Sequence, residues 1–317
     1  MNDSAMHPGV AAPAAPSGLA GPPPEIEARL RALGAVLDMN ATRALYEPLL
    51  ARQRRDGVRI VRDQAYGPDV RHRLDVYRPE AQTAPAPMLL VFHGGGFVRG
   101  DKAERENAGL RFGRDGFVTM VPNYRLGPTH HWPAGAEDVI AALEWARAHA
   151  ADLGGDPRAL WLLGESAGAA HVATATLLKR FHPPAGLRIA GAVLVSGVYN
   201  VHLERLARAQ FGLATPDPRN EPYFGSDFAR YPAMSVVAQV DAAPFPLLIT
   251  FAERDLVQMQ VQAGELFARL VTQHGFAPEL AVIPDHNHLS QVFAVNTGDE
   301  SLTEPVLRFL RARAAHS

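Results

Sequence analysis

The sequence predicts a protein of the α/β class, in which helices cover both faces of a mainly parallel sheet. Short apolar runs of strand length alternate with longer segments in which apolar residues recur every three or four positions. Gly, Pro and Asn residues separate these segments. Strands that alternate with helices usually lie parallel, with the helices packed on the sheet as crossovers. The segments are too irregular in length for a solenoid or a propeller.

The periodicity also predicts where the elements lie. The N-terminal part should form two helices, and a less regular region is expected over about 201–243. Helices are predicted over 25–39, 42–55, 133–157, 167–180, 257–275 and 301–314. Strands are predicted over 73–79, 87–96, 116–126, 159–166, 189–197, 246–255 and 278–288.

The composition is that of a globular protein with a sizeable core. The chain has 317 residues, of which 47% are hydrophobic and 20% are charged. Residues 1–24 are rich in Pro, Ala and Gly and lack Lys and Arg, so we expect a flexible tail before a single domain over 25–317. The absence of cysteine excludes disulfides, thiolate nucleophiles and cysteine-ligated metals. Covalent chemistry would therefore need another nucleophile.

The charge of the chain argues against an electrostatic partner. The formal net charge is −2, without a basic stripe or an acidic tail, so neither nucleic acid nor an anionic membrane is an expected partner. A neutral or small substrate is favoured instead. The N-terminal segment lacks the basic start and the continuous apolar core of a secretory signal, and no long apolar run follows. We therefore expect a cytoplasmic protein.

The candidate functional residues follow the predicted strands. In open parallel sheets, ligands bind beyond the carboxyl ends of the strands. The residues at these positions are His93–Gly96, Glu165–Gly168, Asp255, His286 and His288. Together they supply a hydroxyl, a carboxylate, an imidazole and a glycine-rich loop, which are the groups that acyl transfer needs. We therefore expect them to form one site.

The segment GESAG, residues 164–168, has the form G-x-S-x-G between a strand and a helix. In this pattern the serine occupies a tight, strained turn, with its hydroxyl exposed at the edge of the sheet and a helix N-terminus behind it. The flanking glycines relieve crowding in the turn. Ser166 is therefore the predicted nucleophile, and the simpler alternative is that it only caps the helix.

The loop HGGG, residues 93–96, directly follows the apolar run MLLVF. A tetrahedral intermediate of acyl transfer has an oxyanion that needs preorganised N–H donors, and glycines let the backbone approach it closely. The amides of Gly94 and Gly95, with the amide of Ala167 as a third donor, are therefore the predicted oxyanion hole. His93 is expected to tie the loop to its neighbours rather than to act as an acid or a base.

A serine hydroxyl needs a base, and the base needs a carboxylate that orients it. Where the serine occupies such a turn, the acid follows it in the chain and the histidine comes last. Asp255 is the predicted acid, with Glu253 as its competitor. His286 and His288 are the candidate bases. We expect only one of them to reach Ser166.

A metal site is the alternative interpretation of this histidine pair. Asp285 would then be the third ligand beside His286 and His288. No further cluster of metal-binding residues supports a metal site. We therefore expect no metal at this position.

These motifs resemble those of the hormone-sensitive-lipase-like carboxylesterases, a branch of the α/β-hydrolase superfamily. The resemblance covers about 70–315 and rests on HGGGFVRGD, NYRLGP, WPAGAEDVIAALEW, GGDP, GESAG and AERD. It implies the α/β-hydrolase fold, with a mainly parallel eight-stranded sheet flanked by helices and without a metal or organic cofactor. It also implies a helical cap over the site, formed here by about 25–60 and 201–240.

The resemblance allows two roles for the aromatic residues near the site, and it favours one of the two histidines as the base. Aromatic residues in the second cap segment either line the pocket or form the core of the cap. They are Phe211, Tyr223, Phe224 and Tyr231. The ending DHNHL is nearest to that of the kynurenine formamidases of the same superfamily, and a match on this ending selects His288 over His286 as the base.

The predicted function is that of a serine carboxylesterase that hydrolyses small to medium uncharged esters through an acyl-enzyme. An arylformamidase or related amidase with the same residues is the first alternative, and the DHNHL ending is its specific support. A non-catalytic ligand-binding protein on a hydrolase scaffold is a remote second alternative. The expected partner is a small-molecule ester, and the oligomeric state is left open, with a homodimer as one option.

Overall fold

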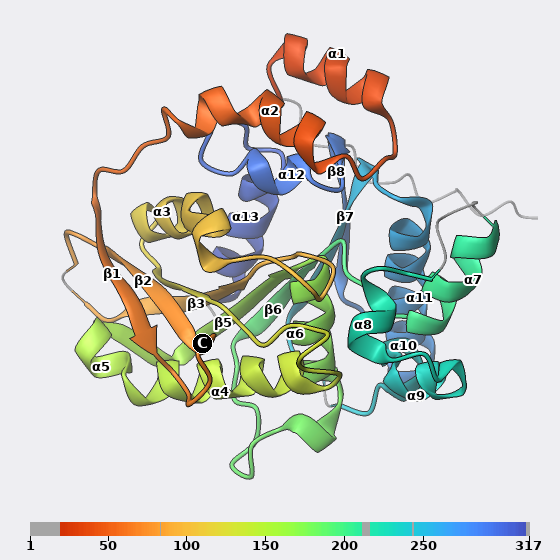
Figure 1. The fold of residues 1–317 in the computed structure, drawn as a ribbon. Coiled ribbons are helices and arrows are strands. Elements are labelled where there is room, and N and C mark those ends of the chain that lie inside the picture. Colours follow the sequence, from red (N-terminus) through yellow and green to blue (C-terminus); the bar gives the residue numbers. More distant parts are fainter. Residues whose placement is uncertain (1–19, 83, 211–215, 243, 315–317) are drawn as a thin grey trace, which may run out of the picture.

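An eight-stranded sheet forms the centre of the molecule. The computed structural model describes residues 20–82, 84–210, 216–242 and 244–314. The strands are β1 Val58–Ala65, β2 Arg73–Pro79, β3 Ala86–Phe92, β4 Val118–Pro122, β5 Gly155–Glu165, β6 Gly191–Val195, β7 Leu247–Arg254 and β8 Glu279–Asn287. They lie in the order β1-β2-β4-β3-β5-β6-β7-β8 (Figure 1). From β4 to β8 in this order the strands are parallel, whereas β2 is antiparallel to both neighbours, which confirms the predicted sheet.

Helices cover both faces of this sheet. They are α1 Pro24–Leu33, α2 Met39–Leu50, α3 Glu106–Arg114, α4 Ala134–Ala148, α5 Ala150–Leu153, α6 Ala167–Leu177, α7 Val201–Gln210, α8 Asn220–Phe224, α9 Tyr231–Met234, α10 Val236–Gln239, α11 Val257–His274, α12 Ser290–Phe293 and α13 Thr303–Ala314. One face packs against α4, α6 and α11, and the other against α3 and α13. In β3, Met88 and Leu90 belong to the first core and Leu89 and Val91 to the second, because successive strand side chains point to opposite faces.

The structure contains elements that were not predicted, among them β1 and α3. Strand β1 was not predicted, since it lies at the edge of the sheet with only one buried residue, and its apolar alternation is weak. Helix α3 was not predicted either, because it contains two glycines, which disfavour helix. A Cβ at Gly109 would lie 2.4 Å from the ring of Tyr77, so the glycine allows α3 to pack closely on β2.

Two predicted helices are shorter in the structure. The helix expected over 25–39 ends at Leu33, because Gly34 adopts a φ of 68°. The helix expected over 133–157 is divided into α4 and α5 and is followed by Gly154 in the left-handed region, so that β5 begins at the next residue. Glycines thus end both helices earlier than their apolar periodicity suggests.

Two groups of helices flank the carboxyl ends of the central strands. Helices α1 and α2 lie over α12 and the end of β8, whereas α7 to α10 lie beside α11 (Figure 1). The first group shares an apolar cluster with the segment after β8, which includes Leu30, Tyr46, Leu289 and Phe293. Most of the predicted tail lies outside the described residues, and the division of the chain into tail, domain and cap stays a prediction. Among the described helices, none is both long and apolar enough to span a membrane.

Candidate active site

Ser166 lies in a strained turn between β5 and α6. Its backbone has φ 50° and ψ −117°, and its side chain forms no capping hydrogen bond with the helix. The flanking glycines are required by close backbone approach. A Cβ at Gly164 would lie 2.4 Å from the carbonyl oxygen of Gly168, and one at Gly168 would lie 2.3 Å from that of Phe92. The turn therefore presents the hydroxyl rather than using it to cap α6.

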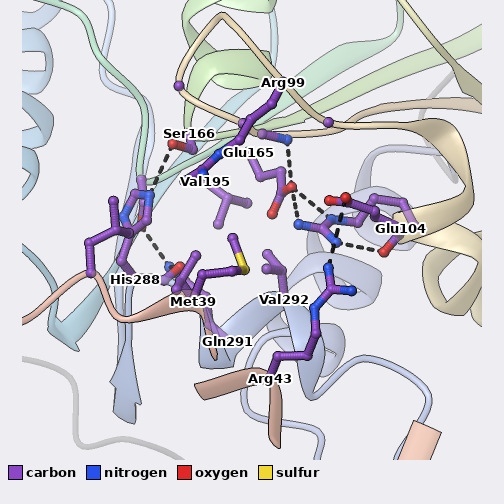
Figure 2. Close-up of a pocket in the computed structure, with 18 of the residues that line it drawn as sticks. Met39, Arg43, Arg99, Glu104, Glu165, Ser166, Val195, His288, Gln291 and Val292 are labelled. Atoms are coloured by element: carbon purple, nitrogen blue, oxygen red, sulfur yellow. Dashed lines mark hydrogen bonds and ion pairs between the residues drawn. The ribbon is translucent and has the colours of Figure 1, made fainter. Parts of the chain in front are cut away.

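A chain of hydrogen bonds joins three side chains that follow three parallel strands, and Figure 2 shows its part between Ser166 and His288. The Nε2 atom of His288 lies 2.9 Å from Oγ of Ser166, and its Nδ1 atom lies 2.7 Å from Oδ1 of Asp255. Asp255 and His288 are buried, with 0% and 6% of their surfaces exposed. The structure thus brings together the predicted nucleophile, base and acid.

The competing residues point to other partners. Nδ1 of His286 lies 2.9 Å from Oγ of Ser290, and its Nε2 lies 3.2 Å from Oδ2 of Asp299, away from Ser166. Glu253 accepts a hydrogen bond of 2.7 Å from the backbone N–H of Asp285. Within the described part of the chain, no group of three His, Cys, Asp or Glu side chains is arranged to hold a metal ion.

Burial and charge have opposite effects on the pKa values of His288 and Asp255. Burial lowers the pKa of His288, but the nearby Asp255 carboxylate and its hydrogen bond outweigh burial, so that this pKa is raised above 6.5. Burial raises the pKa of Asp255, and the interactions with His288 and Ser196 outweigh it, so that this pKa is lowered. The pair therefore combines an ionised carboxylate with a more basic imidazole, as a proton-accepting base requires.

Two further residues, which sequence reasoning missed, orient this pair. The hydroxyl of Ser196 donates a hydrogen bond to Oδ2 of Asp255. Nε2 of Gln291 donates to Oγ of Ser196 at 2.7 Å and to the carbonyl oxygen of His288 at 3.2 Å. Ser196 directly follows β6 and has a φ of 49°, so its place after a strand could have identified it. No comparable sequence signal marks Gln291, because only the fold brings it there.

The three predicted donors of the oxyanion hole, Gly94 and Gly95 in the glycine loop and Ala167 in α6, have different hydrogen-bond partners. The N–H of Gly94 donates to Oε1 of Glu165 at 2.6 Å, and that carboxylate is also paired with Arg105. Gly95 has a φ of 133°, and a Cβ there would lie 1.9 Å from the carbonyl oxygen of Arg99. Among the described residues, none accepts a hydrogen bond from the N–H of Gly95 or of Ala167 at the start of α6. Gly94 is thus tied to a carboxylate in this structure, whereas the other two amides are not.

His93 lies beneath this loop. Its Nδ1 atom is 2.6 Å from the carbonyl oxygen of Gly94, and its ring stacks on that of Tyr124 with centroids 4.4 Å apart. Burial lowers the pKa of His93 to about 4, so the ring is neutral near pH 7. These contacts fit the predicted structural role of His93.

A cavity of about 250 Å³ opens beside Ser166 and His288. Its roof includes Leu37, Met39 and Arg43 from the N-terminal segment and Arg219 from the segment before α8. Of the aromatic residues considered as pocket residues, the described ones, Tyr223, Phe224 and Tyr231, do not line this cavity. Tyr223, Phe224 and Tyr231 pack with Phe97 in an apolar cluster, which corresponds to the cap-core alternative, and Phe211 lies outside the described residues.

Comparison with known proteins identifies the family. A family profile described as the alpha/beta hydrolase fold matches residues 89–292. The chain belongs to this family. This finding confirms the predicted fold, and relatives that are named esterases agree with the predicted hormone-sensitive-lipase-like branch.

Curated relatives are similar over parts of their length. Esterase LipC of Mycobacterium tuberculosis is 40% identical over 105 residues, which cover 32% of this chain and 26% of LipC. A probable isoprenylcysteine alpha-carbonyl methylesterase of Oryza sativa is 25% identical over 271 residues, which cover 80% of this chain and 64% of that protein. The chain therefore spans less than two thirds of the length of both relatives.

Solved structures are similar over nearly the whole chain. Esterase B of Lactobacillus rhamnosis superposes with a TM-score of 0.71 at 20% identity and covers 92% of this chain and 95% of its own. A bacterial heroin esterase superposes with a TM-score of 0.69 at 27% identity, and the match covers 92% of this chain and 97% of the heroin esterase chain. The similarity to esterase B shows that the two proteins share a fold.

Proposed function

We propose that the protein is a serine carboxylesterase that cleaves small to medium esters through an acyl-enzyme. The main support is the hydrogen-bonded chain from Ser166 through His288 to Asp255, which borders a cavity large enough for a short ester. Relatives named as esterases, among them LipC and the heroin esterase, support the same activity. Helices α1, α2 and α7 to α10 would form the cap that surrounds the substrate.

In the first half of the reaction, Oγ of Ser166 attacks the ester carbonyl carbon while Nε2 of His288 takes the hydroxyl proton. The carbonyl oxygen becomes an oxyanion, which the N–H groups of Gly95 and Ala167 would stabilise. Gly94 would hold the loop through Glu165, because its own N–H is already bonded to that carboxylate. The C–O bond to the alcohol then breaks, and the alcohol leaves with the proton from His288.

In the second half, water hydrolyses the acyl-enzyme. His288 accepts a proton from the water as its oxygen attacks the acyl carbon, and it returns this proton to Oγ of Ser166 when the acid leaves. The carboxylate of Asp255 stabilises the imidazolium in both halves and keeps Nδ1 protonated. Ser196 would act as a positioning residue, since its hydroxyl donates to the second oxygen of that carboxylate.

The decisive experiment compares hydrolysis of p-nitrophenyl esters, from acetate to decanoate, by the wild type and by Ser166→Ala. The substitution should lower kcat by about 10⁴-fold or more, because the nucleophile is removed. Ser226→Ala is the matched control. Its hydroxyl is exposed before α9, so this variant should retain wild-type kcat/KM.

Other results would overturn the proposal. Equal activity of Ser166→Ala and the wild type would exclude Ser166 as the nucleophile. N-formylkynurenine is included because turnover of this formamide without turnover of esters would favour the arylformamidase alternative. Binding of esters without any hydrolysis would favour a non-catalytic ligand-binding protein.

A further inference from the structure

The cavity beside Ser166 is lined by more cationic than anionic side chains. The charged residues of its wall are Arg43, Arg99, Arg105, Arg219, Glu104 and Glu165. This local excess contrasts with the formal net charge of −2 for the whole chain. The local charge, rather than the total charge, acts on a bound substrate, because exposed charges further away are screened by salt.

Two of the four arginines are paired with the two glutamates. Nε of Arg105 donates to Oε1 of Glu165 at 2.7 Å, and both side chains are buried. The guanidinium of Arg43 lies 3.8 Å from the carboxylate of Glu104 at a more exposed position. Both anions of the cavity wall are therefore paired, and neither of them pairs with Arg99 or Arg219.

Arg219 is only weakly compensated. Its Nε atom lies 3.8 Å from Asp217, but Asp217 already pairs with Arg208 at 2.9 Å, and that pair is buried. The aliphatic part of Arg219 lies against the glycine loop, since a Cβ at Gly96 would be 2.8 Å from its Cδ. Burial has the largest lowering influence on the pKa of His288, and the charge of Arg219 acts in the same direction. The side chain of Arg219 therefore lies against the glycine loop, and its charge is near enough to His288 to influence the pKa of that histidine.

Arg99 comes from the end of the same loop. Its side chain is exposed, lines the cavity and is drawn beside Ser166 and Val195 in Figure 2. Among the described residues, none forms an ion pair with it. Arg99 and Arg219 thus place two positive charges on the wall that also holds the nucleophile.

We propose that this cavity selects esters that carry a carboxylate, which Arg219 and Arg99 bind. The inference rests on the proposed esterase function and names its substrate class. It departs from the expectation of an uncharged substrate, which followed from the total charge of the chain. Guanidinium groups donate charge-assisted hydrogen bonds to carboxylates, with a geometry that fits the two oxygens. In a cavity of about 250 Å³, the carboxylate must lie only a few atoms from the ester carbonyl, as in a short dicarboxylic monoester.

The test compares kcat/KM for three esters of similar size. The neutral probe is p-nitrophenyl butyrate, the second is mono-p-nitrophenyl succinate, and the third is a nitrophenyl butyrate with a carboxylate on its ring. The wild type should prefer at least one anionic ester over the neutral one by about tenfold, since hydrogen bonds to charged groups are of this strength. The two anionic probes show whether the acyl or the alcohol part carries the charge.

The variants Arg219→Gln and Arg99→Gln should reduce this preference toward one, and added salt should reduce it in the wild type. Arg59→Gln is the matched control, because Arg59 is an exposed arginine on β1 outside the cavity. It should leave the preference and the activity unchanged. Equal kcat/KM for neutral and anionic esters in the wild type, or an unchanged preference in both cavity variants, would overturn the inference while leaving the esterase proposal intact.

A binding measurement tests the site without turnover. In the Ser166→Ala background, monomethyl succinate should raise the temperature of unfolding more than methyl butyrate does, and Arg219→Gln should remove this difference. Equal shifts for the two ligands would refute the carboxylate site. If no ester is hydrolysed but the succinate shift depends on Arg219, the site stands and the esterase function fails.

Discussion

The floor and the roof of the cavity are built in different ways. The floor consists of loops that directly follow strands, and backbone contacts fix it, as at Gly95, where a Cβ would lie 1.9 Å from the carbonyl oxygen of Arg99. The roof consists of long side chains from two distant segments, such as Met39 before the sheet and Arg219 after β6. Under the proposed function, we therefore expect the floor to determine which reaction takes place and the roof to determine which substrate fits.

Substitutions in the floor and in the roof should therefore affect different kinetic constants. A change in the floor should disturb the hydrogen bonds at the reacting atoms and reduce kcat. A change in the roof leaves Ser166, His288 and Asp255 in place and should act on KM and selectivity. The variants below test this division, and any exception would show that floor and roof are coupled.

The largest effect is expected for Asp255→Asn in the floor. The amide cannot stabilise the imidazolium of His288, so kcat should fall by about 10⁴-fold. The pH profile of kcat/KM provides a second measurement. In the wild type the pKa of His288 is raised, and the base is lost as pH falls through that pKa, so the acid limb should lie above 6.5. In the variant, the attraction and the hydrogen bond of the Asp255 carboxylate are lost, while burial still lowers the pKa of His288, so the acid limb should move to lower pH.

Glu253→Gln is the control for this prediction, since Glu253 was the competing acid in the sequence. Its carboxylate accepts a backbone hydrogen bond outside the site, so activity and pH profile should match those of the wild type. A loss in Glu253→Gln comparable to that in Asp255→Asn would contradict the assignment of the acid. An acid limb that stays in place in Asp255→Asn would contradict the coupling between Asp255 and His288.

The next largest effect is expected for Gly95→Ala. The added Cβ would lie 1.9 Å from the carbonyl oxygen of Arg99, and a φ of 133° is strained for alanine, so the loop must move. Displacing one oxyanion donor should lower kcat by about 10² to 10³-fold with a smaller change in KM. Steady-state kinetics and thermal unfolding would be measured together.

Gly264→Ala is the matched control for this substitution. Gly264 lies in α11, where an added Cβ would meet no described atom within 4 Å outside its own stretch of helix, so alanine should stabilise the helix by about 0.5–1 kcal/mol and leave kcat unchanged. Full activity of Gly95→Ala would show that the amide of Gly95 does not stabilise the oxyanion.

The same division explains how much of the site could be predicted. Residues of the floor follow strands in short continuous motifs, so the sequence alone predicts that Ser166, Asp255 and one histidine meet at one edge of the sheet. The structure then separates the two histidines, with His288 beside Ser166 and His286 beside Asp299. Regular alternation in a strand would place residues 286 and 288 on the same side, so it does not explain this separation. The two side chains diverge because β8 ends at Asn287, before His288, and because Asp285 interrupts the regular strand with a φ of 61°.

The roof could not be predicted in this way. Met39 and Arg219 are far apart in the sequence, and neither lies in a motif. The sequence offers the aromatic residues of the insertion as candidate pocket residues. In the structure, however, Tyr223 stacks on Phe97, because large apolar side chains are needed to hold short helices together. Helix α3 escaped prediction for a related reason, since its glycines serve contact with Tyr77 rather than helix propensity.

The smallest effect is expected for Met39→Ala in the roof. Loss of the side chain widens the cavity and removes apolar contact with the substrate, so KM for short esters should rise by about fivefold, in proportion to a few lost methylene contacts. Acyl-chain preference should move toward longer esters, while kcat stays within about twofold because the hydrogen bonds of the floor are untouched. Leu45→Ala is the control, since Leu45 lies on the same helix and packs against the same apolar cluster as Met39 but does not line the cavity. A fall in kcat at constant KM in Met39→Ala would mean that α2 orients the catalytic residues, and the separation between floor and roof would then fail.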